Sequence, residues 1–301
     1  MNANDLFSTI TDQLVADIEA GAGTWRMPWH ALADVGTPTS VDRRPYRGMN
    51  AIWLPMVGAA NGWTSGVWAT YRGWQRHGAQ VRRGERGTHV VLWKPTAGAS
   101  DAVAEDETDA APRRRLLART YVVFAAEQAD GTDAILERRA SELADRDTPE
   151  RIESADTYFA VVGARVVIGG NRACYEPGGD TIRLPDLAQF DTAAHFYATS
   201  AHEHIHWTGH PERLARDLTG RFGSDAYAAE ELVAELGAAM WCAQAGVSAT
   251  TRHDHAAYLA HWLRVLRSDP RALVSVAARA QAAVDHLNAL AGHPVTAVPA
   301  A

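Results

Sequence analysis

The order of apolar and polar residues predicts a mixed fold for the first half of the chain. Residues 1–21 have the pattern of an amphipathic helix, and a second helix is predicted to begin near residues 50–56. Residues 88–93 and 116–125 are apolar and rich in β-branched side chains, which is typical of strands. The segment between them, residues 96–115, is polar and acidic, so we predict a β-hairpin with a long mobile tip.

The second half is predicted to begin with a helix near residues 152–162, followed by three short strands. The strands are expected near residues 164–168, 172–175 and 181–184, with a Pro-Gly-Gly-Asp turn before the last of them. The rest of the chain is predicted to be mostly helical to about residue 290.

Two of the later helices have clear boundaries. Residues 192–207 form one predicted helix. Ser224 or Asp225 can cap the next, which runs to about Gln244, and Gly246 is its expected stop.

A charged stretch near residues 128–150 separates the two patterns. We therefore predict an α+β fold with two domains. The expected divisions are residues 1–128, a linker or helical connection at 129–149, residues 150–292, and a disordered tail at 293–301.

The composition excludes several classes of protein. With 301 residues, 47% of them hydrophobic, the chain can bury a core. No apolar run approaches the roughly 20 residues of a membrane span, and the N-terminus lacks the features of a signal peptide. The two cysteines, Cys174 and Cys242, form no CxxC pattern, which argues against a disulfide scaffold. We therefore expect a cytoplasmic protein with no membrane partner.

Residues 202–206 read His-Glu-His-Ile-His, which is an HExxH motif on a predicted helix. Four residues span about one helical turn, so His202 and His206 project from the same face and can hold one Zn²⁺. Glu203 stands beside them as the candidate general base, and His204 faces away. An exposed helix with a polar His and Glu face can match this motif by chance. The neighbouring aromatic residues indicate a buried helix, however, and histidines on a buried helix need partners.

The third ligand is expected from the helix that follows. Glu231 is the first choice, and Glu235 shares its face four residues later. From there Glu235 is expected to hydrogen-bond a ligand histidine without binding the metal itself. Glu230 is expected to lie on a solvent-exposed acidic face of the same helix.

A competing pattern leaves two alternatives for the third ligand. In HExxHxxGxxH enzymes a third histidine completes the site. Gly209 fits that pattern here, but Glu212 occupies the last position and His210 comes two residues early. His210 and Glu212 therefore remain alternatives to Glu231.

The net charge of −7 hides an uneven distribution. Between residues 40 and 95, nine basic residues accompany two acidic ones, which gives that segment +7 and leaves −14 for the rest. Seven of the ten tryptophans lie between Trp25 and Trp93 and interleave with these arginines. Single-stranded nucleic acid is bound by this combination, because bases stack on aromatic faces while cations follow the backbone.

The same residues also suit a small tryptophan-rich core with a solvated basic rim. DNA binding requires exposed aromatic rings, for which Tyr46 and Trp74 are the first candidates. The full set of candidate DNA contacts is Tyr46, Arg47, Arg72, Trp74, Arg76, Arg82 and Arg83.

Short motifs are spread over nearly the whole chain. Those of the first half include Trp25-x-x-Pro28-Trp29, Tyr46-Arg47-Gly48-Met49-Asn50, Trp68-x-Thr70 and Phe124-x-Ala126-Glu127-Gln128. Those of the second half include Tyr175-x-Pro177, His202-Glu203-x-x-His206-Trp207-Thr208-Gly209-His210 and Tyr227-Ala228-x-Glu230-Glu231-Leu232. In these motifs the chain resembles the ArdC-type antirestriction proteins of plasmids and other mobile elements.

The resemblance implies an N-terminal domain that binds single-stranded DNA and a C-terminal zincin-like metallopeptidase domain. With Glu231 as third ligand, we predict a site of the gluzincin type. It also implies a role in shielding incoming DNA from host restriction. The expected partners are single-stranded DNA and a protein or peptide substrate, and the expected cofactor is one Zn²⁺ or another divalent ion per chain. Two other functions fit the residues. One is a non-enzymatic DNA-binding protein with a structural metal, and the other is a housekeeping metallopeptidase whose first domain binds peptides.

Overall fold

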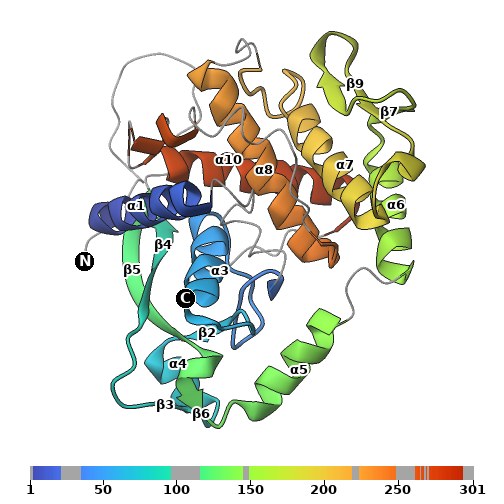
Figure 1. The fold of residues 1–301 in the computed structure, drawn as a ribbon. Helices are drawn as coiled ribbons and strands as arrows, with labels where there is room; N and C mark the ends of the chain where they lie inside the picture. The colour runs from blue at the N-terminus through green and yellow to red at the C-terminus, as the bar shows by residue number, and fades with distance from the viewer. Residues whose placement is uncertain are drawn as a thin grey trace, which may run out of the picture.

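The computed structural model describes most of the chain and shows a mixed α+β architecture (Figure 1). The described residues are 3–21, 35–95, 116–144, 149–218, 224–248, 262–264, 266–267, 269 and 271–293. The helices are α1 (Ala3–Gly21), α3 (Met49–Asn61), α4 (Tyr71–Arg76), α5 (Asp133–Ala144), α6 (Pro149–Val162), α7 (Ala193–Thr208), α8 (Asp225–Ala245) and α10 (Ala272–Leu290). The strands are β1 (Thr39–Ser40), β2 (Val67–Ala69), β3 (Gln80–Val81), β4 (Thr88–Pro95), β5 (Leu116–Ala125), β6 (Ala129–Asp130), β7 (Arg165–Ile168), β8 (Cys174–Glu176) and β9 (Thr181–Leu184).

The predicted hairpin is the main part of the N-terminal sheet. β4 pairs antiparallel with β5 along its whole length. β2 pairs antiparallel with the other edge of β5, and β1 runs parallel to β2, so the strand order is β1-β2-β5-β4. The strands expected at 88–93 and 116–125 are confirmed, and the expected mobile tip, residues 96–115, lies outside the described residues.

A small lobe extends this half at the end where Figure 1 places α4, β3 and β6. β3 and β6 pair antiparallel within it. α5 is also tied to this half, because Arg139 donates hydrogen bonds to the backbone oxygens of Val35, Thr37 and Ser65 at 2.8, 3.0 and 2.8 Å. Residues 129–144, for which the sequence predicts a connection, are therefore attached to the N-terminal half.

The C-terminal half combines a small sheet with long helices. β9 is the central strand, parallel to β7 and antiparallel to β8. α7 packs against β8, β9 and α8, and α10 packs against both α7 and α8 (Figure 1). The three expected strands are confirmed, although β8 begins two residues later than predicted. None of the described helices is long and apolar enough to cross a membrane.

One buried cluster joins the two halves. It contains Leu6, Ile10 and Leu14 of α1 and Ile52 of α3, together with residues of α7, α8 and α10. Burying one such side chain contributes roughly 1.5–3 kcal/mol, so separating α1 and α3 from the C-terminal helices is costly. The two halves therefore fold around a common core.

A glycine in α8 allows α8 to approach α7 closely. A methyl group at Gly237 would lie 2.8 Å from Cδ1 and 2.9 Å from Cγ1 of Ile205. Ile205 is fully buried and β-branched, so its side chain has little freedom to move away. This contact holds together the two helices that carry the HExxH motif and the candidate glutamates.

Gly237→Ala should lower the free energy of unfolding by about 1–3 kcal/mol, as measured by chemical denaturation. Overpacking of that size outweighs the roughly 0.5–1 kcal/mol that alanine gains over glycine within a helix. Ile205→Val removes the closest methyl group and should cost less in the Gly237→Ala background than in the wild type. Unchanged or increased stability of Gly237→Ala would contradict this close packing.

Candidate functional site

Two capped helices carry the candidate site. α7 begins after Thr192, whose hydroxyl accepts a hydrogen bond from His195 N at 3.1 Å. α8 begins after Ser224, which accepts from Tyr227 N at 3.2 Å, and ends at Gly246 with a left-handed φ of 72°. Glycine adopts that conformation without a steric cost. The cap at Ser224 and the stop at Gly246 are confirmed.

His202, His206 and Glu231 bring three donor atoms together. The Nε2 atoms of the two histidines lie 3.1 Å apart, and the Glu231 carboxylate oxygens lie 3.4 Å from His202 Nε2 and 3.5 Å from His206 Nε2. Neighbouring ligands in a tetrahedral site with metal–ligand bonds of about 2.0–2.1 Å are separated by about 3.3–3.4 Å. The observed separations are close to that value, so these side chains fit a metal ion of this size.

The second ring nitrogen of each histidine faces another carboxylate. His202 Nδ1 lies 3.2 Å from Glu235 Oε1, and His206 Nδ1 lies 3.2 Å from Glu230 Oε1. A carboxylate on Nδ1 fixes the tautomer and the ring orientation that direct Nε2 toward a metal. The structure brings Glu235 to His202 as expected. The expectation of a solvated Glu230 is wrong, because its side chain is only 11% exposed.

Arg216 explains why Glu230 lies inside the protein. Its guanidinium donates to the Glu230 carboxylate at 2.8 and 3.0 Å and to the Thr208 hydroxyl at 2.8 Å. It also donates to the backbone oxygen of Ile205 at 2.6 Å, near the end of α7. Sequence reasoning missed this arginine because a single residue in the segment after a helix has no periodic signal.

Opposite charges dominate the electrostatics of this group. Burial lowers the pKa of His206, but the carboxylates of Glu231 and Glu230 outweigh it and raise that pKa to about 10. Burial raises the pKa of Glu231, yet the two histidines hold it well below its usual range. A cation held here would take the place of the proton on His206 and be attracted by the same carboxylates.

Glu203 lies next to His202 on α7 and is buried. Burial raises the pKa of the Cys174 thiol on β8, and the Glu203 carboxylate adds to that increase. α7 packs against β8, so this electrostatic interaction joins two neighbouring elements.

The other polar residues near the motif lie apart from this group. His204 is fully buried with Nδ1 2.8 Å from Ser200 O, and burial lowers its pKa to about 4. His210 Nδ1 accepts a hydrogen bond from Glu212 N at 3.2 Å. Within the described part of the chain, neither His210 nor Glu212 joins the three-donor group formed with Glu231.

Glu230→Gln and Glu235→Gln should each weaken zinc binding by about 10–100-fold, because each loses a carboxylate that orients a histidine. Competition with a chromogenic chelator at constant pH measures the affinity. Glu212→Gln is the matched control, since Glu212 is exposed and its side chain lies outside the three-donor group of the described structure. Wild-type affinity in both test variants would show that these carboxylates do not support the site.

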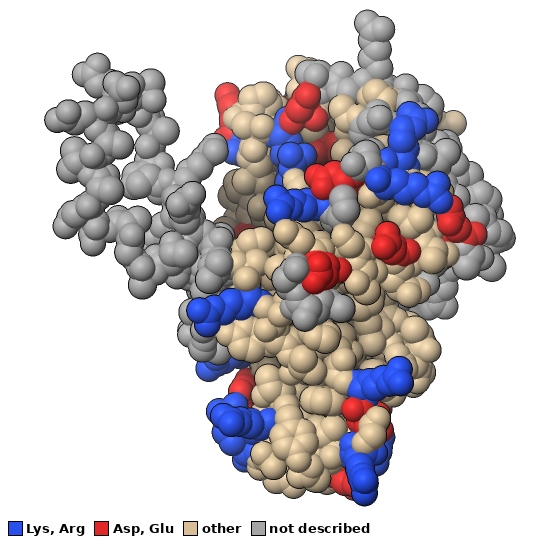
Figure 2. All heavy atoms as spheres, turned by 90° about the vertical axis from the view of Figure 1, so that its left-hand side faces the viewer, with Lys and Arg blue, Asp and Glu red and all other residues tan. Residues whose placement is uncertain are grey.

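Most candidate DNA contacts lie on the small lobe. Arg72 and Arg76 belong to α4, Arg82 and Arg83 follow β3, and all four are exposed. Figure 2 shows basic side chains on both sides of the lower end of the molecule, with acidic side chains beside them, and α4, β3 and β6 form this end in Figure 1. Tyr71, which is 44% exposed and was not among the candidates, adds an aromatic ring. These five residues are called the lobe surface below.

The remaining candidates are buried or half-buried. Trp74 is 0% exposed and donates its Nε1–H to Phe124 O at 3.0 Å, so the expectation of an exposed ring is wrong. The short helix α4 uses this ring to attach to the sheet. Arg47 is half-buried and paired with Asp285 of α10. Tyr46 is also half-buried, and burial raises the pKa of its hydroxyl well above the ordinary value.

The other tryptophans of the N-terminal half contribute mainly to packing. Trp68 is fully buried, and Trp53 donates an indole hydrogen bond to the backbone of β4. Trp93 is partly exposed beside α1. Trp25 and Trp29 lie outside the described residues.

Comparison with known proteins accounts for both halves. The N-terminal domain of anti-restriction factor ArdC matches residues 4–124, and the zincin-like metallopeptidase family matches residues 153–279. The metal-free crystal structure of the antirestriction ArdC protein from plasmid R388 has a TM-score of 0.77 and 36% identity. The match covers 96% of this chain and 98% of that one. The chain belongs to the ArdC antirestriction family.

Further relatives of this ArdC-family protein include one long enzyme. The Mn(II)-bound structure of the R388 protein has a TM-score of 0.73 and 34% identity, covering 95% of this chain and 97% of that one. The uncharacterized protein y4eC of Sinorhizobium fredii is 44% identical and covers 95% of this chain and 92% of its own length. The DNA primase TraC of Escherichia coli is 36% identical over 90% of this chain, which corresponds to only 26% of TraC. The expected family and two-part α+β architecture are confirmed.

Proposed function

We propose that this protein protects incoming mobile-element DNA from restriction by binding single-stranded DNA, and that it hydrolyses a peptide at a divalent-metal site. Its ArdC-family membership supports the antirestriction role. A relative that is a DNA primase accords with a nucleic-acid partner. The observation that carries the hydrolase assignment is the convergence of three donor atoms beside a buried glutamate.

His202 and His206 would hold the ion through Nε2, and Glu231 through its carboxylate. Two imidazoles and one carboxylate are the ligands of a known class of catalytic zinc sites, so one Zn²⁺ per chain is our first expectation. The Mn(II)-bound form of the R388 relative supports binding of a divalent ion. Such an ion supplies positive charge that polarises a peptide carbonyl and acidifies water.

We assign Glu203 the role of general base and then general acid. Its carboxylate accepts a proton from the attacking water and passes it to the leaving amine. Because Glu203 is buried beside His202, its proton transfers take place away from bulk solvent. Glu235 and Glu230 keep the two imidazole rings in the orientation that the site needs.

The number of ligands favours catalysis over a structural metal. Structural zinc sites are closed by four protein ligands, whereas catalytic sites use three and keep one position open. Three donor side chains of the described chain converge here, with a candidate base next to them. This argues against the alternative of a DNA-binding protein with a purely structural ion.

The edge of β8 offers a place for an extended peptide substrate. β8 is the last strand in the order β7-β9-β8, so its outer edge pairs with no strand of the described sheet. Extended peptides bind such edges through main-chain hydrogen bonds. α7, which carries Glu203, packs against β8, so a peptide on this edge would lie beside the helix of the proposed base.

The lobe surface suits single-stranded DNA. Its exposed arginines can contact phosphates, although Arg82 must first exchange its ion pair with Glu85, at 2.9 Å, for a phosphate. The ring of Tyr71 can stack on a base, which contributes on the order of 1–3 kcal/mol. Bases stack in this way only when they are unpaired, so single strands should be preferred over duplex.

Replacing Arg82 and Arg83 by glutamine should weaken binding to single-stranded DNA and flatten its salt dependence. Each lost phosphate contact should reduce the slope of log K against log salt by about 0.7. Tyr71→Ala should weaken binding by at least about fivefold and leave the slope nearly unchanged. Fluorescence anisotropy with a labelled oligonucleotide, at several salt concentrations, measures both quantities in the full-length protein.

Arg138→Gln provides the matched control, because Arg138 is an exposed arginine of α5 outside the lobe surface. It should leave affinity and slope close to wild type. If the lobe variants behave like this control, the lobe surface is not where DNA binds.

A further inference from the structure

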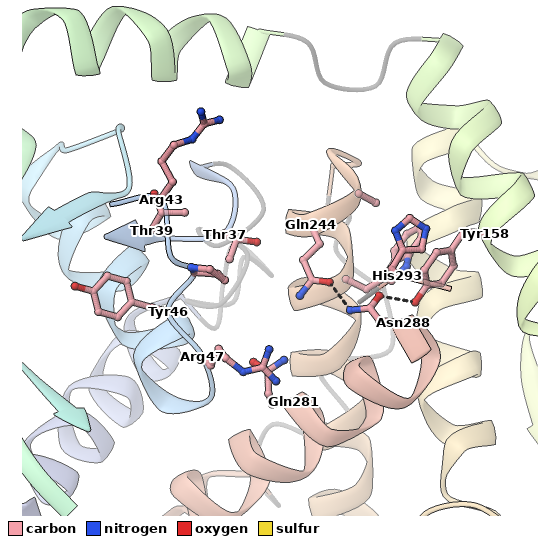
Figure 3. A pocket seen from close by; sticks show the side chains of 13 residues that line it. Thr37, Thr39, Arg43, Tyr46, Arg47, Tyr158, Gln244, Gln281, Asn288 and His293 are labelled. Atoms are coloured by element: carbon pink, nitrogen blue, oxygen red, sulfur yellow. Dashed lines mark hydrogen bonds between the residues drawn. The ribbon is translucent and has the colours of Figure 1, made fainter. Parts of the chain in front are cut away.

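A cavity lies between the two halves of the molecule. Its volume is about 430 Å³, within the range of about 300–1,000 Å³ typical of small-molecule sites. Figure 3 shows Thr37, Thr39 and Arg43 on one wall, facing Gln244 and Asn288 across the space. Gln244 lies on α8 well beyond Glu231, roughly 20 Å along the helix at 1.5 Å per residue. The cavity is therefore separate from the metal centre.

Contacts between the halves fix the distance between the two walls. Arg47 pairs with Asp285 of α10, and Gly48 N donates to Gln281 Oε1 at 3.1 Å. Gln281 Nε2 in turn donates to Asp285 Oδ1 at 3.1 Å. Arg47 and Gln281 line the cavity and lie close together in Figure 3. The cavity is thus bounded by an ordered interface.

The C-terminal wall presents amide groups in a fixed orientation. The Tyr158 hydroxyl donates to Asn288 Oδ1 at 2.9 Å, and Asn288 Nδ2 donates to Gln244 Oε1 at 3.0 Å (Figure 3). This arrangement leaves Gln244 Nε2 as a donor without an acceptor among the described residues. The exposed ring of His293 lies beside Tyr158, 5.6 Å between ring centres, and adds a flat surface.

A buried hydroxyl on the opposite wall has no hydrogen-bond partner among the described residues. Thr37 Oγ1 is shielded from solvent and makes no hydrogen bond to the described residues. A buried polar atom without a partner destabilises the fold, and valine would fill the same space without that penalty. In Figure 3 the Thr37 side chain points toward Gln244 across the cavity. Thr37 lines the cavity, so a rotation of its side chain would bring Oγ1 within reach of a polar ligand there, and that ligand would supply the missing partner.

We propose that this cavity binds a nucleotide. Amides and hydroxyls can hydrogen-bond the edge of a base, and the His293 ring can stack on its face. Arg43, whose side chain is 73% exposed, lies 3.7 Å from the Glu142 carboxylate, its one ionic partner among the described residues, and can meet a phosphate. No described residue that lines the cavity is acidic, which also favours an anionic ligand.

This inference rests on the proposed binding of single-stranded DNA. The nucleotide is then one residue of the bound strand, unstacked and inserted between the halves. A free mononucleotide has the same chemistry and is the second source to test. In either case the ligand contacts both halves, so its binding strengthens the interface made by Arg47, Gly48 and α10.

Thr37→Val and Gln244→Leu in the full-length protein test this proposal. Each should raise the Kd for a labelled single-stranded oligonucleotide about fivefold, the loss expected for one hydrogen bond. Thr37→Val should also keep or increase the melting temperature, because an unpartnered buried hydroxyl is removed. Thr64→Val, at an exposed threonine of the same half, is the matched control and should bind like wild type.

A second probe separates the two sources. The four deoxynucleoside 5′-monophosphates at millimolar concentration should raise the melting temperature of the wild type more than that of Thr37→Val. If the oligonucleotide binds and Arg82→Gln weakens it while both cavity variants bind like wild type, the cavity inference is overturned and the proposed function stands. If only the mononucleotides bind, in a Thr37-dependent manner, the cavity takes a free nucleotide and the proposed DNA binding fails. If neither probe binds, both proposals fail.

Discussion

His202→Ala, His206→Ala and Glu231→Ala should each empty the metal site, whereas Glu203→Gln should retain about one ion per chain. Each alanine removes one of three converging donor atoms. Metal affinity should therefore fall by more than about 100-fold, which is the largest loss usual for residues that only hydrogen-bond a ligand. Glu203 is assigned as a base and not as a ligand, so its amide variant keeps all three donors. Metal analysis after dialysis without chelator measures the content.

His210→Ala and Glu212→Ala are the controls for the metal experiment. Both residues lie outside the three-donor group, and both should keep the ion. Metal loss in His210→Ala with retention in Glu231→Ala would reverse the assignment of the third ligand. Equal loss in Glu203→Gln and the histidine variants would contradict the role given to Glu203.

Glu203→Gln should lower peptide hydrolysis by roughly 10²–10⁴-fold, the usual contribution of a general base. A quenched fluorescent peptide library, incubated with the metal-loaded protein, measures the rate. Glu212→Gln should retain the wild-type rate. Undiminished hydrolysis in Glu203→Gln would show that another group moves the proton.

The same Glu203→Gln variant separates two mechanisms of protection. We expect it to bind single-stranded DNA like wild type, because the lobe surface lies in the other half of the chain. We also expect it to protect incoming DNA from restriction, since coating a strand requires no cleavage. The frequency of plasmid transfer into a restricting recipient measures protection. Loss of protection with intact DNA binding would make proteolysis the mechanism.

Local spacing predicts much of the metal centre. His202 and His206 share a face because four residues make about one helical turn, and Glu231 and Glu235 share a face for the same reason. The cap and the stop of α8 also follow from short-range chemistry at Ser224 and Gly246. These features depend on neighbours within a few residues, so a single sequence contains them.

Contacts between distant segments could not be predicted in this way. Glu230 has the sequence context of a solvated residue, but its carboxylate contacts Arg216 and His206 inside the protein. Trp74 has basic neighbours in the sequence, yet its ring packs under the sheet because the small lobe needs a large core residue. In both cases tertiary packing decides burial, and neither helical nor strand periodicity reports it.

The relation between the two halves also required the structure. Arg47 belongs to a motif rich in polar residues and was expected to contact DNA, but its guanidinium is paired with Asp285 of α10. Likewise, α1 is predicted as an amphipathic helix without any indication of which elements cover its apolar face. The structure packs that face into the core of the C-terminal half. An α+β chain with two families of motifs therefore behaves as one folded body around a shared core.

Crystals of this protein grown with Zn²⁺ or Mn²⁺, and diffraction data collected at the absorption edge of the metal, test the proposed centre directly. One anomalous peak is expected between α7 and α8, about 2.0–2.2 Å from His202 Nε2, His206 Nε2 and a Glu231 oxygen. An open coordination position should face Glu203. A peak bound by His210 or Glu212 in place of Glu231, or no peak between the two helices, would contradict this account.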